Sequence, residues 1–155
     1  MILAEFSKQP RGPYLFETWL WGSNVHTSIG YLPLELYTPI DQQPKDSMVS
    51  IAAELAAYAS SHGELLLDLI YGHYCYFKAQ DWLSFWNVPD NLGRSEVLSQ
   101  VESIVLSVHS DLVAGILVNI LWDQEHSLSL SYESGVITEA NNGEFKIRDG
   151  TLIFP

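Results

Sequence analysis

The densest group of residues that could do chemistry in this 155-residue sequence is Trp122-Asp-Gln-Glu-His-Ser-Leu128. Asp123, Glu125 and His126 all belong to residue types that bind metal ions. A histidine beside a carboxylate could also act as a general base, because imidazole titrates near neutral pH. On an extended segment Asp123 and Glu125 would point to one side and His126 to the other. A structural interpretation stands beside these: a hairpin corner in which Trp122 packs in the core and the polar residues bond locally.

A second group consists of aromatic residues that could line a ligand pocket. Trp82, Phe85 and Trp86 lie close together in the chain, and Trp19 and Trp21 form a separate pair. Their spacing is more typical of a helix that packs in a core. Exposed beside carboxylates, however, such rings would anchor a basic partner, since Trp and Tyr are enriched at binding hot spots. The candidate binding residues are therefore Trp82, Trp86, Trp122, Asp123, Glu125 and His126.

Other reactive residue types form no recognisable catalytic group. His73 and Cys75 are two positions apart on a predicted helix, so their side chains diverge, and Cys75 is expected to be a small buried hydrophobe. Glu64 and Asp68 share one helix face, as acids on solvated faces often do. The sequence contains no zinc-ligand spacing, nucleophile elbow or phosphate-binding loop. It therefore predicts no catalytic residue, no metal ion and no cofactor.

The charge balance restricts the possible partners. Nineteen Asp and Glu face seven Lys and Arg, which gives a net charge of −12. A nucleic-acid partner is excluded because it needs clustered Lys and Arg, and an anionic membrane is disfavoured for the same reason. Between Arg94 and Lys146 the chain has no basic residue other than histidine, but it carries Glu96, Glu102, Asp111, Asp123, Glu125, Glu133, Glu139 and Glu144. These acids indicate either a solvated surface or a docking face for a basic protein.

Composition and targeting features indicate a folded cytoplasmic protein. Hydrophobic residues make up 47% of the chain, which excludes disorder as its main state. Cys75 is the single cysteine, so no internal disulfide can form, as suits a reducing compartment. The first ten residues lack the pattern of a signal peptide. The near-apolar run from residue 65 to 77 is too short to span a bilayer.

The elements that must position these residues change in type along the chain. Residues 14–21 and 25–32 are predicted to be extended, and Pro33, Pro39 and Pro44 are expected to interrupt regular structure afterwards. One helix is predicted from Asp46 or Ser47, with Gly63 at its C′ position. A second, nearly all-apolar helix is predicted over residues 64–86, ending before Pro89.

The last third is predicted to be an antiparallel meander. Strands are expected over 103–109, 115–122, 126–133, 136–140, 145–147 and 151–154, after a helical turn or two within 95–101. Leu128, Leu130 and Tyr132 alternate with serines, which is typical of a strand with one solvated face. The chain is therefore predicted to be a single α+β domain, residues 1–155. Its antiparallel sheet would carry two central helices on one face.

The segment from Gly115 to Val136 carries a resemblance. An apolar strand, Trp122-Asp-Gln-Glu-His-Ser-Leu128 and an alternating strand follow one another. This order resembles a bacterial domain family of unknown function that is marked by a W-D-[PE]-E-H-G-L turn. The family's usual glycine after the histidine is Ser127 here. The resemblance covers about the C-terminal 60 residues and implies no established activity. Small acidic bacterial proteins of this kind are also similar as a class to immunity proteins encoded beside toxins.

Three functional hypotheses follow. The favoured one is a non-enzymatic intracellular binding protein, an immunity-type inhibitor that docks an acidic face onto a basic toxin or effector. The alternative is a small metal-dependent or general-base hydrolase that uses Asp123, Glu125 and His126 with a third partner such as His109. The third is assembly through the aromatic N-terminal strands.

Overall fold

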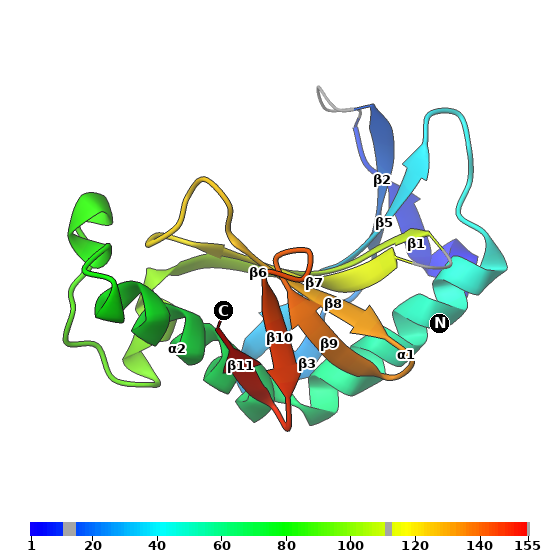
Figure 1. Cartoon of the computed structure of the whole chain (residues 1–155). Helices are drawn as coiled ribbons and strands as arrows, with labels where there is room; N and C mark the ends of the chain where they lie inside the picture. The colour runs from blue at the N-terminus through cyan, green and yellow to red at the C-terminus, as the bar shows by residue number, and fades with distance from the viewer. Residues whose placement is uncertain (11–14, 111–112, 155) are drawn as a thin grey trace.

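A long sheet forms the centre of the molecule (Figure 1). The computed structural model describes residues 1–10, 15–110 and 113–154, so Tyr14 and Asp111 lie outside the described residues. In spatial order the nine strands are β1 (Phe6–Lys8), β2 (Phe16–Trp21), β5 (Leu34–Pro39), β6 (Val101–Ser110), β7 (Val113–Ile120), β8 (Leu128–Glu133), β9 (Val136–Ala140), β10 (Phe145–Arg148) and β11 (Thr151–Ile153). Neighbouring strands are antiparallel except β5 and β6, which are parallel.

Two helices cover one face of this sheet (Figure 1). Helix α1 (Asp46–Ser61) packs on β5, β6 and β7, and helix α2 (Gly63–Ala79) packs on β11 and on the 3-10 helix η3 (Glu96–Gln100). Helix α1 buries residues three and four positions apart, as its sequence periodicity predicts. Helix α2 is buried more widely around its circumference. The prediction of one α+β domain with both helices on one sheet face is confirmed.

The two faces of the sheet differ as the alternation in β8 predicts. Leu128, Leu130 and Tyr132 are buried against the helices, whereas Ser129 and Ser131 are partly exposed on the opposite face. The core-facing side chains of α1, α2 and the strands form one continuous hydrophobic cluster. This cluster is the rigid base from which the loops at the sheet ends project.

Pro33, Pro39 and Pro44 do lie at breaks in regular structure, but the sequence did not predict the strand β5 between the first two of them. Leu34 and Leu36 are completely buried in β5, a central strand. Pro33 precedes this strand and Pro39 ends it, and proline is compatible with strand ends because no central ladder hydrogen bond is lost there. The predicted single strand over 25–32 is instead a hairpin of β3 (Val25–Thr27) and β4 (Gly30–Leu32), which forms a separate small sheet.

Gly63 follows the C-cap residue His62 and so holds the predicted C′ position, but its φ is not positive as in a left-handed cap. It begins α2 directly after the first helix, so the two helices are joined through His62 alone. A Cβ at Gly63 would lie 2.4 Å from Ser28 Oγ and 2.9 Å from Ser28 N. The glycine is therefore needed for the close approach of the helix junction to the β3–β4 turn, rather than for a left-handed helix cap.

Candidate functional site

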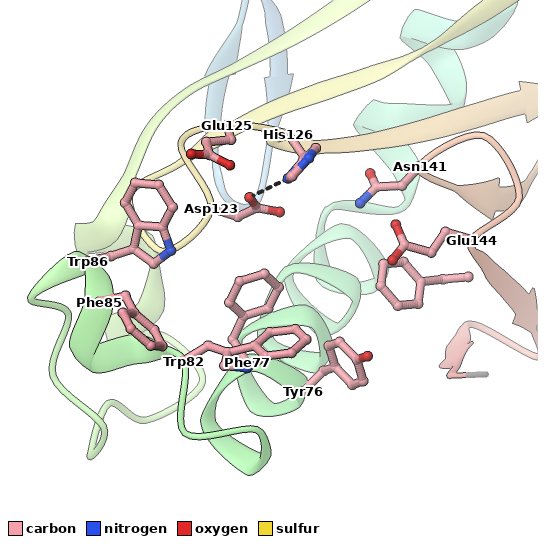
Figure 2. A pocket seen from close by; sticks show the side chains of 11 residues that line it. Tyr76, Phe77, Trp82, Phe85, Trp86, Asp123, Glu125, His126, Asn141 and Glu144 are labelled. Atoms are coloured by element: carbon pink, nitrogen blue, oxygen red, sulfur yellow. Dashed lines mark hydrogen bonds and ion pairs between the residues drawn. The ribbon is translucent and has the colours of Figure 1, made fainter.

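A cavity of about 620 Å³ lies where the C-terminal end of α2 and the 3-10 helix η2 (Leu83–Trp86) face two loops of the meander. Aromatic side chains lie on one side of the cavity and polar side chains on the other (Figure 2). The lining residues are Tyr76, Phe77, Trp82, Phe85, Trp86, Asp123, Glu125, His126, Asn141, Glu144 and Phe145. Five of the six predicted binding residues are thus brought together, from segments about 40 positions apart in the chain.

The aromatic wall forms because α2 ends before Trp82, Phe85 and Trp86, earlier than predicted. Helix α2 stops at Ala79 rather than Trp86, and Asp81 and Asn87 adopt left-handed backbone conformations on either side of η2. Asp and Asn tolerate this conformation better than most residues. The chain therefore turns and presents its aromatic residues as a separate segment. Phe85 is 78% exposed and Trp82 40% exposed, so they are not core residues.

The polar wall comes from two loops at the same end of the meander. In the β7–β8 loop, the Ser127 amide donates to the Asp123 carbonyl oxygen at 2.9 Å. The Ser127 hydroxyl donates to Asn119 Oδ1 at 3.1 Å. Ser127 has a φ of 61°, a left-handed conformation that glycine adopts without steric cost. Asn141 in the β9–β10 loop accepts from the Ser129 amide at 2.9 Å, which ties the two loops together.

Of the two interpretations of this segment, the hairpin corner is confirmed and the extended arrangement is wrong. Residues 121–126 form a turn, and His126 Nδ1 lies 3.0 Å from Asp123 Oδ1 (Figure 2). The Asp123 side chain is only 8% exposed, whereas that of His126 is 71% exposed. The hydrogen bond and negative charge of Asp123, followed by the charges of Glu125 and Glu144, raise the pKa of His126 above its usual value. The imidazole therefore stays protonated to a higher pH than a free histidine.

Trp122 lies beneath the cavity rather than in it. It is fully buried, and its indole N–H donates to His73 Nδ1 at 3.0 Å. Because Nδ1 accepts, the neutral imidazole must carry its proton on Nε2, which is buried without a hydrogen-bond partner among the described residues. Burial lowers the pKa of His73 to about 4. The ring contacts Phe77 and Phe145, so the His73–Trp122 pair supports the cavity floor.

The other reactive residues lie elsewhere. Arg94 binds both Asp68, at 2.6 Å from Nε, and Glu64, at 2.9 Å from Nη2, so this carboxylate pair belongs to an ion-pair cluster. His109 is stacked on Tyr37 and lines a different cavity, on the sheet face opposite the helices. It cannot be the third partner of the Asp123–His126 pair. Cys75 is partly buried against the core, less than predicted.

Trp19 and Trp21 are also separate from the cavity. Both lie in β2, which is paired on its two sides with β1 and β5. The Trp19 indole N–H donates to Thr38 Oγ1 at 3.1 Å. Strand β2 is thus hydrogen-bonded within the sheet on both sides and is not a free edge.

Sequence reasoning did not place Tyr76, Phe77, Asn141, Glu144 or Phe145 at this cavity. In a meander, alternate turns lie at the same end of the sheet, so the predicted strands already place the turn at 141–143 beside the loop after residue 122. That signal would have identified Asn141 and Glu144. Tyr76 had no comparable signal, because its position depends on how the end of α2 packs on the sheet.

Within the described ranges, no three His, Cys, Asp or Glu side chains form a group that could hold a metal ion. The described helices include none that is both long and apolar enough to cross a membrane.

No known protein family, curated protein or solved structure matches the chain.

Proposed function

We propose that this chain is a non-enzymatic binding protein that docks a basic protein onto the surface around the aromatic–acidic cavity. The form we favour is an immunity-type inhibitor that covers a basic toxin or effector. One observation carries the proposal: solvent-exposed aromatic rings and three carboxylates, those of Asp123, Glu125 and Glu144, line the same cavity. Exposed rings beside acids are the features that a basic partner would bury and neutralise.

The two walls of the cavity would contribute differently to binding. Burial of the exposed ring of Phe85 and the half-exposed ring of Trp82 removes apolar surface from water, which favours a stable complex. The carboxylates determine the sign of the partner's charge, and the net charge of −12 attracts a basic protein over a longer range. Aromatic contacts should therefore govern dissociation, and the acidic charges should govern association and its dependence on salt.

A test of this proposal compares variants with the same change in charge. A partner is first captured from an extract of the source cells and identified, and its dissociation constant is then measured at low and high salt. Glu125→Gln with Glu144→Gln removes two carboxylates at the cavity, and Glu102→Gln with Glu133→Gln removes two exposed carboxylates elsewhere. We expect about tenfold weaker binding for the cavity pair and less than about twofold for the control pair.

Two results would contradict the proposal. Equal losses in both double variants would show that only overall charge matters, and not the cavity. Failure to capture any basic protein at any ionic strength would remove the partner that the proposal requires. A partner with a net negative charge would count against it in the same way.

A general-base hydrolase is the second candidate, because the Asp123–His126 pair lies in the cavity at 3.0 Å. The neighbouring Ser127 hydroxyl is directed to Asn119 instead of to this imidazole. The binding proposal predicts no turnover of ester, amide or phosphate substrates by the purified protein. Hydrolysis that is lost in the Asp123→Ala variant would favour the enzyme instead.

A further inference from the structure

We infer that the cavity receives one arginine side chain of the basic partner, whose guanidinium takes the place of His126 at the carboxylate of Asp123. This inference rests on the proposed function and names the chemical group that the cavity recognises. It follows from the burial of Asp123, from the composition of the opposite wall and from the exposure of His126.

Asp123 is a carboxylate that needs a cationic partner. Its side chain is 8% exposed, and a buried carboxylate is costly unless it is paired and hydrogen-bonded. The ion pair that the structure shows for it is with His126, which is 71% exposed and loses its charge as the pH rises. A permanently charged group that enters the cavity would pair with Asp123 more strongly than this imidazole does.

The composition of the cavity favours guanidinium over ammonium. Trp82, Phe85 and Trp86 offer aromatic faces on the side opposite the acids (Figure 2). A planar guanidinium stacks on such faces and is more weakly hydrated than the ammonium of lysine, so entering an aromatic cavity costs it less. Its five donors can also bond to more than one carboxylate, which a point charge does less well, and the cavity lining includes Asp123 and Glu144 from two loops.

His126 then competes with the arginine for the carboxylate of Asp123. The charged groups that face it are Asp123 and Glu125 on its own loop and Glu144 on the β9–β10 loop, while the α2–η2 side of the cavity is aromatic and includes the ionisable hydroxyl of Tyr76. Together these acids raise the pKa of His126. Below that pKa the imidazolium is paired with the carboxylate of Asp123 and repels the incoming cation. Arginine binding should therefore strengthen as the pH rises through the pKa of His126, by up to about tenfold per pH unit below it.

The test uses N-acetyl-arginine N-methylamide as the probe, with the matching lysine and citrulline compounds as comparisons. Binding is followed by the indole N–H resonances of Trp82 and Trp86 in NMR titrations from about pH 6 to pH 9, a range in which the arginine probe stays charged. We expect the arginine compound to bind at least about fivefold more tightly than the lysine compound. The neutral citrulline compound should not bind measurably. Equal binding of citrulline and arginine, or tighter binding of lysine, would overturn the inference.

Variants distinguish the role of each group. Glu125→Gln, at an exposed position, should weaken arginine binding without affecting folding, and Glu102→Gln should leave it unchanged. His126→Gln should bind the probe more tightly than wild type at about pH 6 and show no pH dependence. An affinity that is constant with pH in the wild type would overturn the displacement of His126. If a basic protein still shifts Trp82 and Trp86 when the arginine probe does not, the arginine inference fails and the docking surface stands.

Discussion

His73 is an imidazole held neutral in the core, and its environment makes the stability of the protein depend on pH. Trp122 donates to its Nδ1, and burial lowers its pKa to about 4, against 6.5 for an unperturbed histidine. The folded protein therefore binds this proton only near pH 4, whereas the unfolded chain binds it near pH 6.5. Because the unfolded state binds more protons in this interval, the free energy of unfolding should fall as the pH drops from about 6.5 to about 4.

The expected slope from His73 is at most about 1.4 kcal/mol per pH unit in that interval. Urea unfolding at a series of pH values measures it. His73→Gln is the informative variant, because an amide oxygen can accept from the Trp122 indole but does not titrate there. Its stability should decline less between pH 6.5 and 4 than that of the wild type. The same slope in both proteins would mean that His73 is not held neutral by burial.

Residue types predicted some of these contacts but not others. The hairpin-corner interpretation of the sequence placed Trp122 in the core and the bonds of the polar residues within the corner, as the structure has them. It could not indicate the Trp122–His73 hydrogen bond, because the two residues are 49 positions apart and meet only when α2 packs on the sheet. Glu64 and Asp68 were expected on a solvated helix face. The sequence could not indicate that Arg94 pairs with them, because it reaches them from a distant loop.

At the scale of elements, two glycines of α2 should respond in opposite ways to the same substitution. Gly63→Ala places a Cβ 2.4 Å from Ser28 Oγ and 2.9 Å from Ser28 N, so the helix junction and the β3–β4 turn must separate. We expect a loss of about 1–3 kcal/mol in the free energy of unfolding. Gly72→Ala places its Cβ 3.7 Å from Leu152 Cδ1, an ordinary contact. Because alanine is the better helix former, we expect a gain of up to about 1 kcal/mol.

Thermal or urea unfolding of the two alanine variants beside the wild type gives both values. Gly72→Ala is the matched control for a glycine-to-alanine change in α2 that meets no close contact. Equal stability of Gly63→Ala and Gly72→Ala would contradict the close packing of the helix junction against Ser28. Replacement of Ser28 by glycine in the Gly63→Ala background should recover part of the loss, because the nearest clashing atom is removed.

Periodic elements were predictable, and elements that depend on distant partners were not. The burial pattern of α1 and the alternation in β8 follow from local sequence. Strand β5 was missed because its flanking prolines indicate a break, and only its parallel pairing with β6 makes Leu34–Pro39 a central strand. The end of α2 at Ala79 was missed because residues 80–86 continue an apolar pattern. The left-handed backbone conformations of Asp81 and Asn87 separate this segment from α2.

At the scale of the whole molecule, the surplus acids are not equivalent. Glu64 and Asp68 are paired with Arg94, and Glu139 is paired with Lys146 at 2.7 Å. At the cavity, Asp123 and Glu125 from one loop and Glu144 from another all act on His126 and raise its pKa. The gap in basic residues indicated an acidic surface, but only the fold places these three acids beside the exposed aromatic rings. This juxtaposition, rather than the net charge alone, is the basis of the proposed binding function.

The most direct test of that function is an NMR titration of the protein with its captured basic partner, read on the tryptophan indole N–H signals. Trp82 and Trp86 line the cavity, Trp19 and Trp21 lie in β2, and Trp122 is buried beneath the cavity. We expect the partner to shift the signals of Trp82 and Trp86 and to leave those of Trp19 and Trp21 in place. Shifts confined to Trp19 and Trp21, with Trp82 and Trp86 unchanged, would contradict it.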